Sequence, residues 1–72
     1  MKYKVQVKND LVKEKAELDA KIMRLNNFIR SVNFMKLTTQ HRDMLECQSV
    51  AMTNYSQILR DRIIDITSQE KE

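Results

Sequence analysis

Apolar residues recur at intervals of three and four in the first of two long stretches of the chain. Leu11 begins the series seven residues before Leu18, and Leu18, Ile22, Leu25, Ile29 and Val32 then follow at spacings of four and three. Such spacing gathers apolar side chains along one side of an α-helix and is typical of a coiled-coil seam. It predicts an amphipathic helix over residues 11–32, with Asn9 or Asp10 as its N-cap.

A second stretch shows the same spacing closer to the C-terminus. Its members are Leu45, Gln48, Met52, Tyr55, Leu59, Arg62 and Ile66. Thr38 or Thr39 is suited to cap this helix at its start. The segment between the stretches is short, and the chain has neither glycine nor proline to interrupt a helix. We therefore predict an all-α fold, an antiparallel hairpin of two long helices over residues 10–68 with its turn near residues 31–38.

The two ends of the chain follow other patterns. Tyr3, Val5 and Val7 alternate with lysine and glutamine, which is the period of a half-buried strand. A single strand has no partner within a helical hairpin, so residues 1–9 are predicted to form an N-terminal arm, extended or helical. Residues 69–72 are polar and are predicted to be a frayed tail.

Each predicted helix also carries a second line of apolar residues. These lines are Ala16, Ala20 and Met23 in the first helix and Met44, Ala51 and Ile58 in the second. Contact within a hairpin needs one line per helix, so the second lines leave apolar surface uncovered, which normally marks an interface. A chain of 72 residues also encloses only a small core. The pattern therefore predicts that the hairpins assemble into a homo-oligomer.

The positive charge of the chain is concentrated between Lys21 and Arg42. The chain has 13 Lys and Arg against 10 Asp and Glu, and this window contains basic residues but no acidic one. Arginine and lysine donate charge-assisted hydrogen bonds to phosphate oxygens, and aromatic rings stack on nucleobases. We therefore expect a nucleotide-binding site near the turn, with its other half supplied by a second copy of the chain.

The candidate ligand-binding residues have three expected roles. Phosphate contacts are expected from Arg24, Arg30, Lys36 and Arg42. Base stacking is expected from Phe34 or Tyr55, with Phe28 nearby as a further flat ring, and an interface charge from Arg62. The alternative is that Phe28 and Phe34 only seal the end of the hairpin while the basic side chains stay in water.

Several classes of function lack the residues that they need. His41 is the single histidine and Cys47 the single cysteine, so the sequence contains no metal-ligand cluster and no disulfide. It also contains no glycine-rich phosphate loop and no nucleophile motif. No apolar run approaches the roughly 20 residues that span a bilayer, and no signal peptide is present. We expect a soluble cytoplasmic protein that is not an enzyme and uses no cofactor.

Two segments, LVKEKAELDAKIMRLNNFI (residues 11–29) and RDMLECQSVAMTNYSQILRDRI (residues 42–63), carry a resemblance to a known family. Together they resemble a widespread family of small tailed-phage proteins built as helical hairpins. The residues that carry it are Glu14, Leu18, Gln48, Met52, Tyr55, Arg62 and Ile63. Such phage proteins include oligomeric sponges that sequester the cyclic nucleotide signals of CBASS and Thoeris immunity. The resemblance thus implies a non-catalytic trap that holds its ligand between subunits.

Taken together, these features favour a phage anti-defence protein that binds a cyclic nucleotide immune signal. Its expected partners are further copies of itself and a cyclic or related phosphorylated nucleotide, with no membrane involved. One alternative is a helical inhibitor whose apolar side grips a host defence protein. Another is a small nucleic-acid-binding dimer, for which the charge-balanced helices and the absence of a recognition-helix motif are drawbacks.

Overall fold

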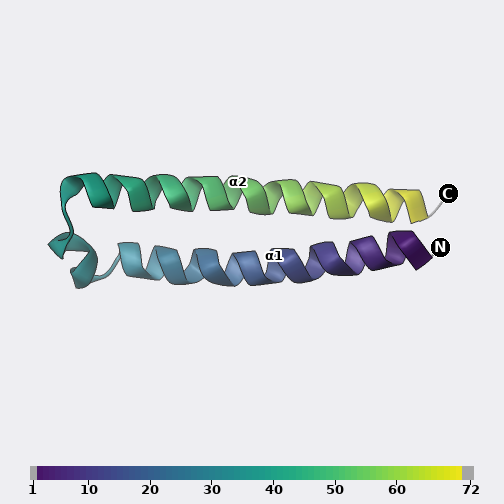
Figure 1. Cartoon of the computed structure of the whole chain (residues 1–72), viewed down its shortest axis with the longest axis horizontal. Helices are drawn as coiled ribbons and strands as arrows, with labels where there is room; N and C mark the ends of the chain where they lie inside the picture. The colour runs from purple at the N-terminus through teal and green to yellow at the C-terminus, as the bar shows by residue number, and fades with distance from the viewer. Residues whose placement is uncertain (1, 71–72) are drawn as a thin grey trace.

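The predicted antiparallel hairpin of two long helices is confirmed by the computed structural model, which describes the backbone of residues 2–70 and the side chains of residues 3–69 (Figure 1). Helix α1 spans Lys2–Ile29, a short 3-10 helix η1 spans Val32–Lys36, and helix α2 spans Thr39–Glu70. The result is a rod of 53 × 14 × 14 Å, closed at η1 and open at the end where both helices meet the chain ends. Residues 2–70 contain no strand.

The N-terminal segment is helical, because α1 begins at Lys2. Its alternating apolar residues therefore do not form an extended arm. Val7 lies one helical turn before Leu11 and packs against the core, which is burial that an unpartnered strand would lack. Asn9 and Asp10 lie inside the helix, so the prediction that either one caps its start is wrong. Likewise α2 continues to Glu70, and residues 71–72 of the predicted tail lie outside the described residues.

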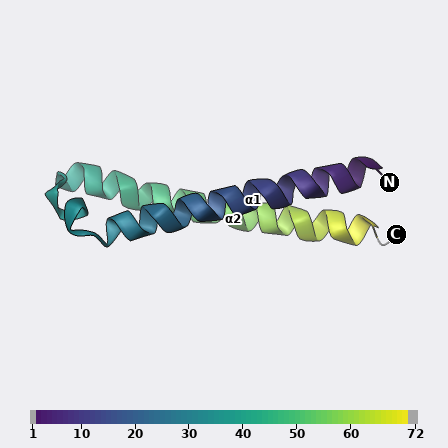
Figure 2. The same cartoon turned by 90° about the horizontal axis from the view of Figure 1, so that it is seen from below.

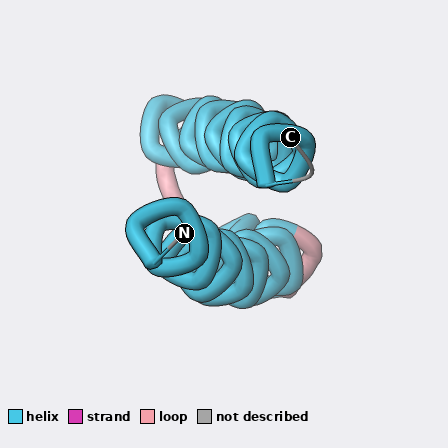
Figure 3. Tube along the Cα trace, turned by 90° about the vertical axis from the view of Figure 1, so that its right-hand side faces the viewer, coloured by secondary structure: helices cyan, strands magenta, loops and turns pink. Residues whose placement is uncertain are grey.

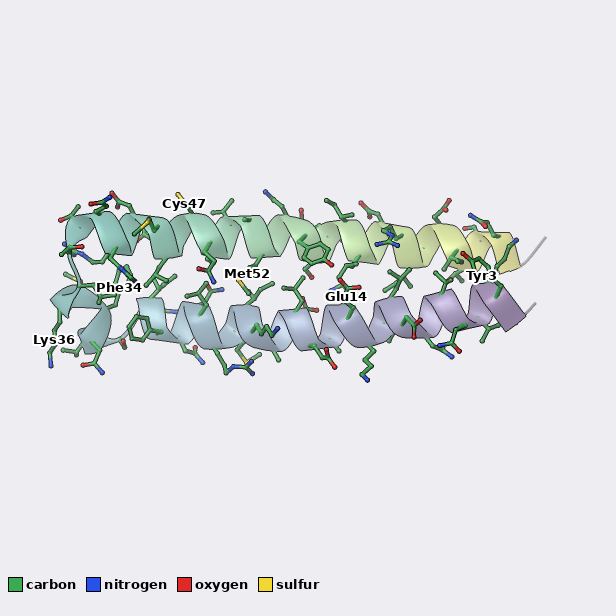
Figure 4. All side chains as sticks on the ribbon, viewed as in Figure 1. Tyr3, Glu14, Phe34, Lys36, Cys47 and Met52 are labelled. Atoms are coloured by element: carbon green, nitrogen blue, oxygen red, sulfur yellow. The ribbon has the colours of Figure 1, made fainter. Side chains whose placement is uncertain are left out.

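The core is a single line of apolar contacts between the two helices. Leu11, Leu18 and Leu59 are buried, and Val7, Ile22, Met52 and Ile63 pack against them. Figure 4 shows Met52 between the helices, whereas Cys47 points away from α1. Leu59 is completely inaccessible to solvent, which makes it the centre of this core.

The seam of α2 differs from the predicted one at every second position. Leu45, Met52, Leu59 and Ile66 are buried or half-buried as predicted. Gln48, Tyr55 and Arg62 are exposed, and Ser49, Ser56 and Ile63 take the intervening places against α1. The predicted spacing was right in period, but three of its seven members belong to the neighbouring side of the helix.

The closed end of the hairpin is sealed by aromatic packing. Phe34 in η1 is 6% exposed, and its ring meets that of Phe28 edge to face, with centroids 6.3 Å apart. Ser31 and Leu37 flank η1 in extended conformations, and no described residue has a positive φ, so the turn forms without glycine. Thr38 caps α2 as predicted, since its Oγ1 accepts the backbone N–H of His41 at 3.1 Å.

Within residues 2–70, nothing covers the outer sides of the two helices. They cross at a shallow angle in Figure 2, and the end-on view of Figure 3 shows only two helical layers. The accessible surface is 5640 Å², whereas a compact protein of this mass, 8.6 kDa, is expected to expose about 4,700 Å². The hairpin therefore exposes roughly 900 Å² more than a compact chain of the same size.

Candidate ligand-binding surface

A ladder of polar contacts joins the two helices on one side of the apolar seam. Ser49 Oγ donates to Asn26 Oδ1 at 2.6 Å, and Ser56 Oγ donates to Asp19 Oδ1. Lys15 Nζ completes the second rung by donating to Asp19 Oδ2 at 2.7 Å and to Ser56 Oγ at 3.1 Å. Seven residues separate the rungs on each helix, so the ladder fixes which levels of α1 and α2 lie side by side.

The ladder also changes the acidity of Asp19. The hydrogen bond from the Lys15 ammonium, followed by that from Ser56, lowers the pKa of the Asp19 carboxyl below its ordinary value. The carboxylate is 47% exposed, so water screens part of this interaction. Asp19 therefore holds the ladder in its charged form.

We expect Asp19→Asn to weaken the pH dependence of hairpin stability. Because the folded pKa is lower than the unfolded one, the carboxylate stabilises the fold above the unfolded pKa of about 3.9, and this contribution is lost as pH falls through the folded pKa. Urea unfolding at a series of pH values from neutral to strongly acidic measures the loss. Asp61→Asn is the control, since that side chain is 67% exposed and its Oδ1 lies 3.5 Å from Arg60 Nη2. Equal acid sensitivity in wild type and Asp19→Asn would contradict the assignment.

The opposite side of the seam carries four of the eight candidate residues, Arg24, Phe28, Tyr55 and Arg62. The ladder residues of both helices lie on one side of the apolar seam. The residues that flank the seam on its other side therefore form a second surface to which both helices contribute. We call this side the tyrosine face; it comprises Glu14, Glu17, Lys21, Arg24 and Phe28 of α1, and Met44, Gln48, Ala51, Tyr55, Ile58 and Arg62 of α2. The ladder register places Lys21 level with Asn54 and Tyr55. Lys21, with Arg24 one turn further on, therefore brings positive charge beside an exposed tyrosine.

The eight residues predicted from the sequence do not form one pocket on one chain. Arg30, Phe34, Lys36 and Arg42 lie at the closed end, whereas Arg24, Tyr55 and Arg62 lie on the tyrosine face; Phe28 belongs to both, because it ends that face where its ring meets Phe34. At about 1.5 Å per helical residue, Tyr55 is about 20 Å and Arg62 about 30 Å along α2 from Arg42. The structure thus divides the predicted site into a bend group and a face group.

Arg42 is the most constrained cation of the bend group. Its Nη2 donates to Thr39 Oγ1 at 3.2 Å and its Nη1 to the sulfur of Met35 at 3.7 Å. Its Nε is buried and finds no hydrogen-bond partner among the described residues. Arg30 directly follows α1 and donates through Nε to the carbonyl of Asn26 at 3.3 Å, while Lys36 projects from the closed end (Figure 4). The bend group therefore combines two anchored guanidinium groups with one exposed ammonium.

The aromatic candidates differ in accessibility. Phe34 is buried against Phe28, as in the alternative in which the rings seal the hairpin end, and this burial disfavours stacking of a base on it. Tyr55 is 43% exposed. Base stacking remains a prediction, and Tyr55 is the ring that the structure leaves accessible for it.

Sequence reasoning left Lys21 and the two ladder serines out of the site. Lys21 was recognisable as the first residue of the acid-free window and lies seven residues before Phe28, which places both on one side of α1. Ser49 and Ser56 gave no such signal, because their hydroxyls have a role only when Asn26 and Asp19 face them across the hairpin.

Other features of the described residues offer no competing site. A shallow hollow of about 640 Å³ on the outer side of α2 contains none of the eight candidates, and Asp43 and Glu46 make it acidic. Among residues 3–69, no group of three or more His, Cys, Asp or Glu side chains could hold a metal ion. No helix within the described part of the chain has the length and apolar content that crossing a membrane requires.

Comparison with known proteins gives one match. The profile of a protein family described as Sequestin matches residues 6–65, which include both helices and the turn between them. No curated protein and no solved structure matches the chain. The matched range contains all eight candidate residues as well as the ladder.

Proposed function

The chain belongs to the Sequestin family, and from this premise we propose that it sequesters a cyclic or related phosphorylated nucleotide without changing it chemically. The observation that carries the proposal is the family match over residues 6–65, because the name of the family denotes sequestration. The resemblance to helical-hairpin phage sponges supplies the ligand class, a cyclic nucleotide signal of CBASS or Thoeris immunity. In this role the protein is a phage anti-defence factor and not an enzyme.

The charges and rings of the hairpin support this ligand class. Between Lys21 and Arg42 no acidic residue opposes the basic ones, so a phosphate group approaches without meeting a carboxylate of that segment. Arg24 supplies a planar guanidinium that can bind two phosphate oxygens at once. Tyr55 supplies an exposed ring beside it for a base.

Isothermal titration tests the proposal directly. We expect saturable heat with at least one member of a panel of cyclic di- and trinucleotides and cyclic ADP-ribose variants, and recovery of the ligand unchanged afterwards. Arg24→Glu is expected to weaken binding about tenfold to a hundredfold by removing charge-assisted hydrogen bonds, and Tyr55→Ala to cost about 1–3 kcal/mol of binding free energy. Lys13→Glu, a charge reversal outside both groups, is the control and should bind as wild type does. No heat with any nucleotide would refute the proposal.

A second candidate is inhibition of a host defence protein by helix packing. The observation that favours it is the exposed apolar surface of α2, where Met44, Tyr55 and Ile58 remain uncovered in the single chain. It predicts that a stoichiometric host protein is retained in a pulldown and lost with Ile58→Asp, while Arg24→Glu has little effect. The two candidates therefore differ in which substitution abolishes function.

A further inference from the structure

We propose that two hairpins pair antiparallel through their tyrosine faces, and that Lys21, Arg24 and Tyr55 of both copies form one nucleotide site at the two-fold axis. The identity of the ligand rests on the proposed function, whereas the pairing rests on the structure alone. The arrangement is a four-helix bundle in which α2 packs on the second copy's α2, and α1 on the second copy's α1.

The first observation is a second coiled-coil seam on α2. Its residues follow one another at spacings of four and three: Met44, Gln48, Ala51, Tyr55, Ile58, Arg62 and Asp65. This is the same period as the seam already packed against α1, and every member is exposed in the single chain. A helix with two adjacent seams of this period is built to pack against two neighbouring helices.

The second observation is that this seam complements itself when one copy is reversed. With the two-fold axis near the level of Thr53, Ala51 lies opposite the second copy's Tyr55, a small side chain against a large one. In the same register the stem of Arg62 packs on the second copy's Met44, and Asp65 faces the second copy's His41. A parallel pairing would instead place Arg62 on Arg62 and Asp65 on Asp65.

The third observation is the distribution of charge along α1. On the tyrosine face the acidic residues Glu14 and Glu17 precede Ala20, whereas the basic residues Lys21 and Arg24 follow it. With the axis near the level of Thr53, which the ladder sets level with Ile22, Glu14 and Glu17 of the second copy lie level with residues 30 and 27 of the first. The antiparallel arrangement thus keeps the acidic residues of the two copies apart, whereas a parallel copy would set like charges against each other.

The fourth observation is the amount of surface that the pairing would cover. The single hairpin exposes roughly 900 Å² more than a compact chain of its mass, and each partner in a standard protein interface buries about 800 Å². Burial of the tyrosine face against a second copy would thus lower the accessible surface area of each chain to about that of a compact protein of the same mass. This agreement favours a second copy over a small peptide as the occupant of the face.

At the two-fold axis the pairing brings positive side chains of both copies together, and a bound anion would neutralise them. The ladder register places Ile22 level with Thr53, so Lys21 and Arg24 lie on either side of the axis and meet their equivalents from the second copy. Four positive groups brought together at one level repel one another unless an anion lies between them. A ligand with two phosphates would neutralise them, and the two Tyr55 rings lie at the same level for its bases. We therefore expect one such ligand per pair of chains.

Matched substitutions test the pairing without any ligand. Ile58 on the tyrosine face and Ile64 on the other side of α2 are 54% and 56% exposed, so Ile58→Asp and Ile64→Asp insert the same charge at equally exposed positions. Native mass spectrometry is expected to give twice the 8.6 kDa chain mass for wild type and Ile64→Asp, and a single-chain mass for Ile58→Asp. A monomeric wild type, or loss of pairing with Ile64→Asp alone, would overturn the proposal.

Cross-linking tests the orientation even if Ile58→Asp unfolds on dissociation. In a Cys47→Ser background, chains carrying Ala51→Cys are mixed with chains carrying Tyr55→Cys and oxidised. The antiparallel register predicts that mixed disulfides between positions 51 and 55 dominate, whereas disulfides between equal positions would overturn it.

Titration of the intact pair then separates the two proposals. We expect one nucleotide per two chains, loss of binding with Lys21→Ala or Arg24→Ala, and retention of the double mass in both variants. Double mass without any nucleotide binding would refute the proposed function and the site at the axis, but not the pairing. Binding at one nucleotide per chain that persists in monomeric Ile58→Asp would refute the site at the axis, but not the proposed function.

Discussion

Replacement of Leu59 by alanine is expected to lower the free energy of unfolding by about 2–5 kcal/mol. Leu59 is fully buried between Leu11 and Leu18, in a core with few other members, so the cavity cannot be filled by neighbouring side chains. Small domains are stable by only about 5–15 kcal/mol in total, so this single change removes a large part of the stability.

Urea unfolding followed by circular dichroism measures this loss. Wild type and variants must be compared at one protein concentration, because the apparent stability of an oligomer depends on it. Ile64→Ala is the matched control: the side chain is 56% exposed, and the change should stay within about 0.5 kcal/mol. Similar losses for Leu59→Ala and Ile64→Ala would show that the seam is not the core of the protein.

Phe34→Ala is expected to destabilise the hairpin by about 3–5 kcal/mol, because it removes the ring that fills the closed end. Phe28→Ala should cost less, since Phe28 is 38% exposed and is not the ring enclosed by η1. Thermal unfolding of the two variants, again at equal concentration, measures the difference. A larger loss of stability for Phe28→Ala would contradict this prediction, because it would show that Phe28, and not Phe34, is the ring that stabilises the closed end most.

The same position separates a structural ring from a binding ring. Phe34→Leu retains an apolar side chain at the closed end but removes the aromatic plane. If Phe34 seals the hairpin, the affinity of Phe34→Leu for nucleotide stays close to that of wild type. A marked loss of nucleotide affinity in a variant that remains folded would instead show that the Phe34 ring stacks on the base, which its burial argues against.

The spacing of apolar residues predicted the two helices and their antiparallel arrangement but not the ends of the first helix, since α1 begins at Lys2 and the predicted member Val32 lies beyond it in η1 and is exposed. Leu18, Ile22, Leu25 and Ile29 are buried or half-buried along the seam of α1, as their spacing predicted. The spacing was not sufficient on α2, where Ser49 and Ser56 replace the expected Gln48 and Tyr55. A small hydroxyl side chain is accepted in a seam only when a partner satisfies its hydrogen bonds, and the partners come from the opposite helix. No pattern within α2 alone contains that information.

The candidate site was predictable in chemistry but not in place. The acid-free window correctly identified a cationic part of the chain, because charge is a property of the residues themselves. Its division into a bend group and a face group depends on the level at which α2 lies beside α1, which the polar ladder sets. Lys21 was recognisable as part of the acid-free window, but its place level with Asn54 and Tyr55 depends on the ladder.

The position of the chain ends allows the connectivity of the hairpin to be rearranged. Lys2 and Glu70 lie at the same end of the rod, opposite η1 (Figure 1). The polypeptide can therefore be joined there by a short flexible linker and reopened between Ser31 and Leu37, a circular permutation that keeps both helices whole. Such a permutant breaks the bend while it leaves the tyrosine face continuous, so its binding of nucleotide would assign the ligand to the helices and not to the turn.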